Sequence, residues 1–188
     1  IKILNLETNE KLDLEITEVK FSDIAWKDDS SGFYYNKYPK PLPENRLSQQ
    51  SYDAAIYFAD IRTGEEKLFY GQINPEQNYT VSFIGEDKKI LIKVITGSEE
   101  ENFYLFGKSL ETLEPITPIN QASFNYIHAD DDGLFFITNL EADNYRLVKV
   151  LFADLQMFEV VSEDNFALKG VSFVNDYLIA DYIDHADM

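Results

Sequence analysis

FSDIAWKDDSSGFYYNKYP, residues Phe21–Pro39, is the stretch that decides the fold of this chain, because weaker copies of it recur three times. The later copies are YTVSFIGEDKKILIKVITG (Tyr79–Gly97), FNYIHADDDGLFFITNL (Phe124–Leu140) and GVSFVNDYLIADYI (Gly170–Ile183). Each copy has a strand rich in aromatic and β-branched residues, an acidic or glycine-containing turn, and a second apolar strand. A repeat of this kind predicts an architecture before any single residue receives a role.

The repeat has a measurable period. One apolar residue stands just before each turn, and the successive intervals are 57, 44 and 46 residues, counted between Trp26, Phe83, Ile127 and Phe173. The long first interval contains PKPLPENRLSQQS, residues 39–51, which is rich in proline and polar side chains and which we interpret as a loop insertion. Without this insertion the period is about 45 residues, the size of one four-stranded propeller blade.

A second kind of hairpin lies between the copies of the first. Its segments are IKILNLETNEKLDL, AAIYFADIRTGEEKLFY, NFYLFGKSLETLEPI and YRLVKVLFADLQMFEVV. Two hairpins per repeat give four antiparallel strands, which is the blade of a β-propeller. The sequence therefore predicts an all-β fold, a partial β-propeller of about four blade-like repeats with four-stranded antiparallel sheets. A β-sandwich with the same number of strands is the competing fold, and the regular period disfavours it.

We expect residues 1–188 to form a single fragment of a propeller domain. The inner hairpins are predicted near residues 21–38, 79–97, 124–140 and 170–183. Because the chain opens on an outer hairpin and closes on an inner one, its ends are out of phase with whole blades. Such ends leave strand edges and apolar blade faces bare, which favours self-association or covering by further blades.

The composition excludes several classes of protein. The 16 Lys and Arg residues stand against 34 Asp and Glu, a formal net charge of −18, which argues against binding to nucleic acids or to anionic membranes. The sequence has no Cys, so we expect neither disulfides nor thiolate chemistry. It shows no secretory signal peptide at its start. We expect a cytoplasmic protein, with the periplasm as the alternative because the start of a longer parent is not visible.

The motifs of hydrolytic catalysis are missing from the sequence. A nucleophile elbow requires G-x-S-x-G, but Gly97-Ser98 is followed by two glutamates. The histidines, His128 and His185, each stand at a strand end beside acidic residues, and no serine lies in an activated context. We therefore predict no catalytic residue in this chain, and we expect no hydrolysis by it alone.

Other polar constellations have plain structural interpretations. Asp130-Asp131-Asp132-Gly133 lacks the alternating ligands and terminal glutamate of a calcium loop and is interpreted as a hairpin turn. The acidic pairs Asp28-Asp29 and Glu65-Glu66 are interpreted as turn residues rather than glycosidase carboxylates. We accordingly predict no metal and no cofactor.

Two further motifs concern asparagine and aromatic residues. Asn78-Tyr79-Thr80 matches a glycosylation sequon, which we expect to be unused. Trp26 and Phe33-Tyr34-Tyr35 are capable of forming an aromatic ligand platform, but their alternation inside a repeat predicts packing between blades.

The first repeat resembles a known family. Ile24–Pro39, IAWKDDSSGFYYNKYP, is similar to the signature blade of prolyl oligopeptidases, which reads approximately W-x-x-D-x-x-G-F-F-Y-x-x-Y-P. Three more segments agree in order, namely LIKVITG at Leu91–Gly97, NYRL at Asn144–Leu147 and YLIADY at Tyr177–Tyr182. The resemblance covers essentially the whole chain, and the first segment is its specific part.

This resemblance implies a function. In the family a seven-bladed propeller covers an α/β-hydrolase domain that carries the serine, aspartate and histidine, and the propeller limits the size of peptides that reach the active site. The chain would then be the middle portion of that propeller, with the hydrolase domain absent. The family often has an arginine and a cysteine where this chain has Ile95 and Ser98, so no substrate contact is transferred and the substrate-binding residues stay unknown.

Our leading hypothesis is thus the gating, substrate-access portion of a serine peptidase that cleaves short peptides after proline. Its partners would be the parent's hydrolase domain, the remaining blades and, through the parent, the peptide substrate. The alternative is a non-catalytic propeller that serves as a binding or scaffold module, because fold alone does not define function. A propeller glycosidase ranks last, because it requires converging carboxylates and arginines and this chain has few basic residues.

Overall fold

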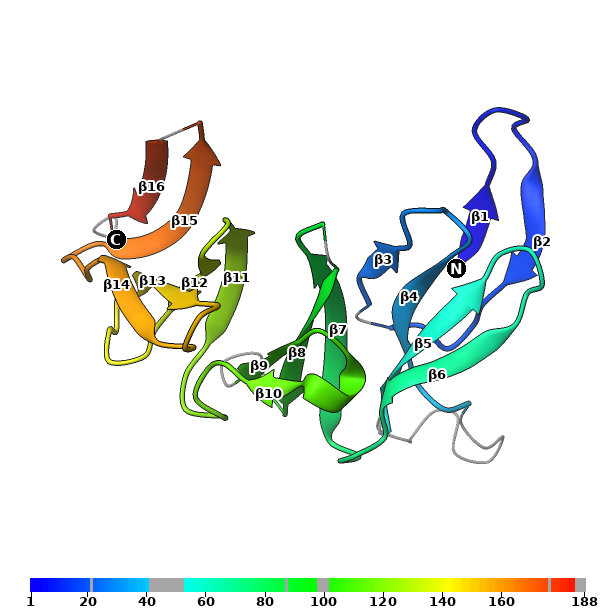
Figure 1. The fold of residues 1–188 in the computed structure, drawn as a ribbon, viewed down its shortest axis with the longest axis horizontal. Helices are drawn as coiled ribbons and strands as arrows, with labels where there is room; N and C mark the ends of the chain where they lie inside the picture. Colours follow the sequence, from blue (N-terminus) through cyan, green and yellow to red (C-terminus); the bar gives the residue numbers. More distant parts are fainter. Residues whose placement is uncertain (21, 41–52, 87, 98–101, 176, 185–188) are drawn as a thin grey trace.

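The computed structural model of the chain describes residues 1–20, 22–40, 53–86, 88–97, 102–175 and 177–184. Within these ranges, three four-stranded antiparallel sheets are flanked by two two-stranded hairpins. Figure 1 shows that the five units follow one another along an arc, from the N-terminus at one end to the C-terminus at the other. The predicted all-β, partial β-propeller architecture is confirmed.

Each unit is built from strands that are consecutive in the sequence. The first hairpin contains β1 (Lys2–Leu4) and β2 (Lys11–Glu15), and the last contains β15 (Ala167–Val174) and β16 (Tyr177–Ile183). The first sheet contains β3 (Ile24–Trp26), β4 (Gly32–Lys37), β5 (Ala55–Asp60) and β6 (Glu66–Gly71). The second sheet contains β7 (Gln77–Ile84), β8 (Lys89–Thr96), β9 (Asn102–Gly107) and β10 (Glu114–Pro115), with the short 3-10 helix η2 (Leu110–Thr112) before β10. The third sheet contains β11 (Phe124–Ala129), β12 (Gly133–Thr138), β13 (Arg146–Leu151) and β14 (Met157–Val161).

The strand order fixes which strand of each sheet faces the centre of the arc. β3, β7, β11 and β15 are the first strands of their units and lie on its concave side (Figure 1). The predicted inner hairpins overlap these strands and their partners β4, β8, β12 and β16. Most of the predicted loop insertion, from residue 41 onward, lies outside the described residues.

The second strand of the third sheet, β12, is apolar on both faces because this sheet packs between two neighbours. In β12 all six residues are buried. Leu134 and Phe136 contribute to the core with the second sheet, whereas Phe135 and Ile137 contribute to the core with the last hairpin. A strand covered on both sides thus appears in the sequence as a continuous apolar run, GLFFIT, rather than as an alternating one.

Four apolar cores join the five units. The core between the first and second sheets gathers Ile56, Tyr79 and Ile92, and the core between the second and third sheets gathers Leu91, Phe124 and Phe136. Phe33 and Tyr35 pack with Ile16 of the first hairpin. Leu168 and Val171 of the last hairpin pack on the third sheet. Burial between successive sheets, rather than one central core, therefore holds the arc together.

Short aspartate turns close the hairpins as predicted from their residue types. The Asp130 carboxylate accepts hydrogen bonds from the N–H groups of Asp132 and Gly133, at 3.0 and 2.9 Å. Asp60 accepts from Arg62 and Thr63 in the same manner. These bonds satisfy N–H groups of the turns that have no hydrogen-bond partner in a neighbouring strand. Residue 176, between β15 and β16, lies outside the described residues.

Some large apolar side chains remain exposed at the ends of the arc. On the last hairpin, Val174, Tyr177, Ile179 and Ile183 are exposed on the face turned away from the third sheet. At the other end, Ile24 and Trp26 pair with Tyr35 and Phe33 and are exposed on the side of the first hairpin. Among the described residues, no helix has the length and apolar character that a membrane span requires.

Candidate functional site

Cross-strand register arranges a polar row on the second sheet. Thr80 of β7 lies opposite Lys93 of β8, and Lys93 lies opposite Tyr104 of β9. In the neighbouring row, nearer the turns, Leu91 lies opposite both Ser82 and Phe106. Leu91 and Phe106 belong to the apolar core that the second sheet shares with the third. The face of the second sheet thus changes from apolar to polar along its strands, and the polar part lines a cavity.

This cavity lies along the inner strands, and we call it the inner-strand groove. It consists of two neighbouring cavities of about 630 and about 240 Å³, which share the lining residues Asp23, Thr80 and Lys93. The remaining lining residues are Ser22, Asn78, Tyr79, Ile95 and Gly97 in the larger part and Ser82, Leu91, Tyr104, Asn125 and Tyr126 in the smaller part. The smaller part spans the boundary between the second and third sheets, because Asn125 and Tyr126 belong to β11.

Tyr104 is the best-fixed polar side chain of the groove. Its hydroxyl oxygen accepts a hydrogen bond from the N–H of Tyr126, at 3.2 Å, and its ring lies 4.9 Å from that of Phe136. Burial, opposed by that hydrogen bond and aided by the negative charge of Asp23, raises the pKa of Tyr104 to about 12. The phenol therefore keeps its proton at neutral pH and can donate a hydrogen bond as well as accept one.

Asn78 and Ser22 are held in place by the first sheet. The Tyr38 hydroxyl donates a hydrogen bond to Oδ1 of Asn78. Burial raises the pKa of Tyr38, so this phenol stays a donor. The Ser22 hydroxyl accepts the backbone N–H of Asn36 at 2.7 Å, which ties the segment before β3 to β4. Asn36 belongs to β4 and Tyr38 follows that strand directly, so both contacts connect the groove to the first sheet.

Asn102 fixes the connection between the second and third sheets behind the groove. Its side chain is fully buried, and its Oδ1 accepts the N–H of Phe124 at 3.1 Å. Its own N–H donates to the carbonyl of Ala122 at 3.2 Å. A buried carboxamide that bridges two sheets satisfies a buried N–H group of β11 and ties β9 to β11.

The aspartate turn considered for metal binding has a different structure. The second carboxylate oxygen of Asp130 pairs with Lys149 Nζ at 2.6 Å, in addition to the turn bonds of the first oxygen. Lys149 also lies within 3.9 Å of Asp132. In the part of the chain that the structure describes, no group of three or more histidine, cysteine, aspartate or glutamate side chains is placed to hold a metal ion.

His128 packs as an aromatic residue. Its ring stacks on Phe173 at 4.6 Å with an interplanar angle of 25°, and lies 6.1 Å from Phe135. The contact joins β11 to β15, and His128 does not line the inner-strand groove. His185 lies outside the described residues.

The aromatic and acidic residues of the first sheet that were considered as a ligand platform or as catalytic carboxylates do not form one site. Phe33 and Tyr35 are fully buried and Tyr34 packs toward the second sheet, whereas Trp26 is 47% exposed with its ring 5.0 Å from Phe33. The two acidic pairs are engaged in ion pairs, in which Asp28 binds Lys88 at 2.9 Å and Glu66 binds Lys37.

Sequence reasoning named none of the groove residues as a binding site. The signal was the alternation in NYTVS, where Asn78, Thr80 and Ser82 occupy every second position of an innermost strand while Tyr79 and Val81 enter the core. These polar residues lie on the face of β7 that is turned toward the third sheet, and two of them line the cavity between the two sheets. Ile95 and Gly97, at the end of the segment Leu91–Gly97, are in the groove wall. Ser98 lies outside the described residues.

Four-stranded antiparallel sheets arranged along an arc, each with its first strand inward, define a segment of a β-propeller. The sequence model described as "Prolyl oligopeptidase, N-terminal beta-propeller domain" matches residues 1–187. The chain belongs to this family, and it forms part of the family's propeller domain.

Curated relatives agree with this assignment. The chain is 30% identical over 154 residues to a prolyl endopeptidase from Elizabethkingia meningoseptica, covering 79% of the chain and 22% of the relative. It is 24% identical over 183 residues to a prolyl endopeptidase from Dictyostelium discoideum, covering 81% and 24%. The chain thus spans less than a quarter of the length of these relatives.

Solved structures share the fold. Prolyl oligopeptidase B from Galerina marginata, bound to a 35mer hydrolysis and macrocyclization substrate, superposes with a TM-score of 0.77 at 22% identity, over 92% of this chain and 26% of that one. A chain from a structural study of two prolyl endopeptidases gives a TM-score of 0.77 at 18% identity, over 97% and 27%.

Proposed function

We propose that the inner-strand groove contacts peptide substrates on their way to the active site of a prolyl-oligopeptidase-type serine peptidase of which this chain is a part. The parent's hydrolase domain would supply the catalytic residues, and its remaining blades would cover the ends of the arc. The single observation that carries the proposal is a groove of hydrogen-bonding side chains on the concave side of the propeller segment.

The chemistry of the groove suits an extended peptide. A peptide backbone offers alternating N–H donors and carbonyl acceptors, and a proline residue offers only the carbonyl. Thr80, Ser82 and Tyr104 carry hydroxyl groups that both donate and accept, and Asn125 carries an amide that does the same. Such side chains satisfy a peptide without demanding one sequence, which fits a surface that admits many substrates.

The charge of the groove is balanced, in contrast to the strongly acidic chain. Asp23 and Lys93 line both parts of the groove. A peptide with free ends or with ionised side chains therefore meets both signs of charge there. This balance supports a route for peptides and disfavours one for polyanions.

The test is a comparison of two substrates with the full-length protein. One substrate is a blocked Gly-Pro dipeptide with a chromogenic leaving group, and the other is a decapeptide with one internal proline. We expect Lys93→Gln to raise KM for the decapeptide about threefold while leaving the dipeptide nearly unchanged, because the dipeptide is too short to reach the groove. The matched control is Lys67→Gln, an exposed lysine of β6 that lies outside the groove.

Two outcomes contradict the proposal. If the unaltered protein cleaves neither substrate, the chain belongs to a non-catalytic propeller that serves as a binding or scaffold module. If Lys93→Gln and Lys67→Gln act equally on the decapeptide, the groove makes no contact with substrate.

A further inference from the structure

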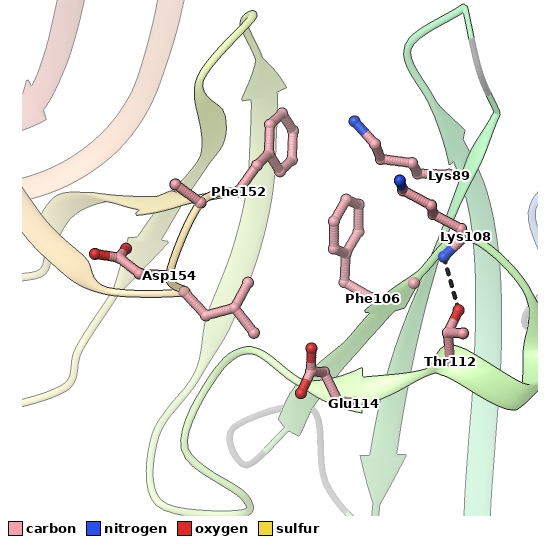
Figure 2. A pocket seen from close by; sticks show the side chains of 10 residues that line it. Lys89, Phe106, Lys108, Thr112, Glu114, Phe152 and Asp154 are labelled. Carbon is pink, nitrogen blue, oxygen red and sulfur yellow. Dashed lines mark hydrogen bonds between the residues drawn. The ribbon is translucent and has the colours of Figure 1, made fainter.

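A second cavity, of about 680 Å³, lies between the second and third sheets near their turns, and we call it the turn-side pocket. Figure 2 shows that its walls come from the ends of β9 and β10 on one side and from the turn between β13 and β14 on the other. It is lined by Lys89, Phe106, Gly107, Lys108, Thr112, Glu114, Phe152, Ala153, Asp154 and Leu155. It shares no lining residue with the inner-strand groove.

The pocket is built on a fixed apolar wall. Phe106 is buried, and its ring stacks on Phe152 at 5.2 Å with an interplanar angle of 12°. Leu155 adds to this wall and packs on the core between the two sheets. Because these rings already pack on each other, binding of a ligand would not incur the entropic cost of ordering them.

The backbone beside this wall is equally constrained. A Cβ atom at Gly107 would lie 2.6 Å from the carbonyl oxygen of Thr112, so the chain comes closer there than any other residue allows. The N–H groups of Lys108 and Ser109 both donate to the Thr112 hydroxyl, at 3.0 and 2.9 Å. The turn that carries Lys108 is therefore held by its own hydrogen bonds.

Charges of opposite sign stand on different sides of the wall. Lys89 Nζ lies 4.5 Å from the centre of the Phe152 ring, and the Lys108 side chain extends beside it (Figure 2). Glu114 lies away from the two lysines, on the lower side of the pocket in the same view, whereas the Asp154 carboxylate stands at its far left edge and points away from the two phenyl rings. One Asp154 oxygen accepts the N–H of Gln156 at 3.1 Å, which orients the carboxylate.

This arrangement selects one class of ligand. The two carboxylates and the net charge of −18 disfavour nucleotides and other polyanions. The two lysines disfavour simple cations. A molecule with one carboxylate, one ammonium group and an apolar part between them satisfies both ends and covers the phenyl wall.

We propose that the turn-side pocket binds a short peptide with free termini. Its C-terminal carboxylate would lie toward Lys89 and Lys108, its ammonium group toward Glu114, and an apolar side chain on Phe106 and Phe152. The pocket lies between two complete four-stranded sheets, so it does not depend on what covers the ends of the arc. The binding is also independent of cleavage, and a product peptide has the required free termini.

The test is calorimetric titration of the purified protein with the tripeptide Ala-Leu-Ala, which has no proline and is therefore no substrate of the proposed peptidase. We expect a dissociation constant of roughly 0.1 mM, typical of a small ligand on a preformed surface. Amidation of the C-terminus and acetylation of the N-terminus should each weaken binding about threefold or more, as the loss of one partly exposed charge contact predicts.

Paired variants locate the site. Lys108→Gln should weaken binding of the free tripeptide but not of its amide, and Glu114→Gln should weaken the free but not the acetylated form. The control variants are Lys67→Gln and Glu10→Gln, which change exposed charges far along the chain. Thermal melting checks that all four variants are folded.

The proposal fails if Ala-Leu-Ala does not bind at about 10 mM, a hundred times the expected constant. It also fails if the pocket and control variants reduce binding equally, because the peptide would then respond only to net charge. Lys108→Gln and Glu114→Gln should weaken tripeptide binding and leave the KM for the decapeptide unchanged, so loss of this site and loss of the proposed peptidase function are separate results.

Discussion

Asp130 illustrates how one side chain sets both a turn and a strand pairing. One carboxylate oxygen accepts two backbone N–H groups of the turn, and the other pairs with Lys149, whose ammonium group lies 5.0 Å from the Phe135 ring centre. Partial burial by itself raises the pKa of Asp130, but the hydrogen bonds from Lys149 and from the turn outweigh it and lower the pKa. The carboxylate form is thus the form that the folded chain favours.

This leads to a prediction about pH. A carboxylate whose pKa is lower in the folded state adds stability that is complete above its unfolded value of about 4 and is lost as the pH falls through the folded value. Asp130→Asn keeps the turn acceptor but removes the charge. We expect it to cost no more than about 1 kcal/mol at pH 7. Urea unfolding at pH 7 and pH 3 should show this cost shrinking at the lower pH, and a cost that grows on acidification would contradict the assignment.

The turn at Asp130 was predictable and its partner was not. An aspartate run followed by glycine has a local mechanism for turning the chain, so the residue types sufficed. Lys149 lies 19 residues away and meets Asp130 only because Phe135 pairs with Lys149 in the ladder between β12 and β13. Such contacts depend on register, which a single sequence does not reveal.

At the scale of the strand, stability comes from the faces that the sheets turn toward one another. Phe136 is fully buried in the core between the second and third sheets, and contacts the rings of Tyr104, Phe124 and Tyr126. Phe158, on the outermost strand β14, is 48% exposed. Two phenylalanines of one sheet thus have very different surroundings.

The matched pair of truncations tests this difference. We expect Phe136→Ala to lower the free energy of unfolding by about 3–5 kcal/mol, because it removes a buried ring and leaves a cavity. Phe158→Ala should cost less than about 1 kcal/mol, as an exposed substitution does. Denaturant titration of both variants measures the two losses. Equal losses would show that the cores between sheets do not carry the stability of the arc.

The same scale explains what the sequence could and could not reveal about the groove. The hairpins, their alternation and their order follow from patterns along the chain, because each sheet uses four consecutive strands. The groove joins Asp23, Lys93 and Asn125, which are distant in sequence and meet only after three sheets have packed. The polar alternation in β7 marked one wall, but no local pattern marked the others.

For the whole molecule, the two ends of the arc have different surfaces. The last hairpin exposes Tyr177 at 74% and Ile179 at 51%, on the face that points away from the third sheet. The first hairpin has a mixed surface, on which Leu4 is 45% exposed and Lys2 forms an ion pair with Glu15. Bare apolar sheet faces favour association.

We therefore expect the isolated 188-residue chain to self-associate through the last hairpin. Ile179→Glu should shift the mass measured by size exclusion with light scattering toward that of a monomer, because it puts a charge on the apolar face. Val160→Glu is the control, since Val160 is similarly exposed but lies on the outer strand β14. A monomeric unaltered chain at low micromolar concentration would refute the expectation.

The phase of the two terminal hairpins has a geometric consequence for such assemblies. β15 and β16 are the first two strands of one blade, and β1 and β2 are in the position of the last two strands of another. The two hairpins are unlike halves that are complementary in order, so the C-terminal end of one copy matches the N-terminal end of the next. A contact between unlike surfaces is heterologous, and it either closes into a ring after a whole number of copies or continues as an open helix. Such a contact between copies of the isolated 188-residue chain would give the assembly a direction, because each added copy would present the same terminal hairpin to the next.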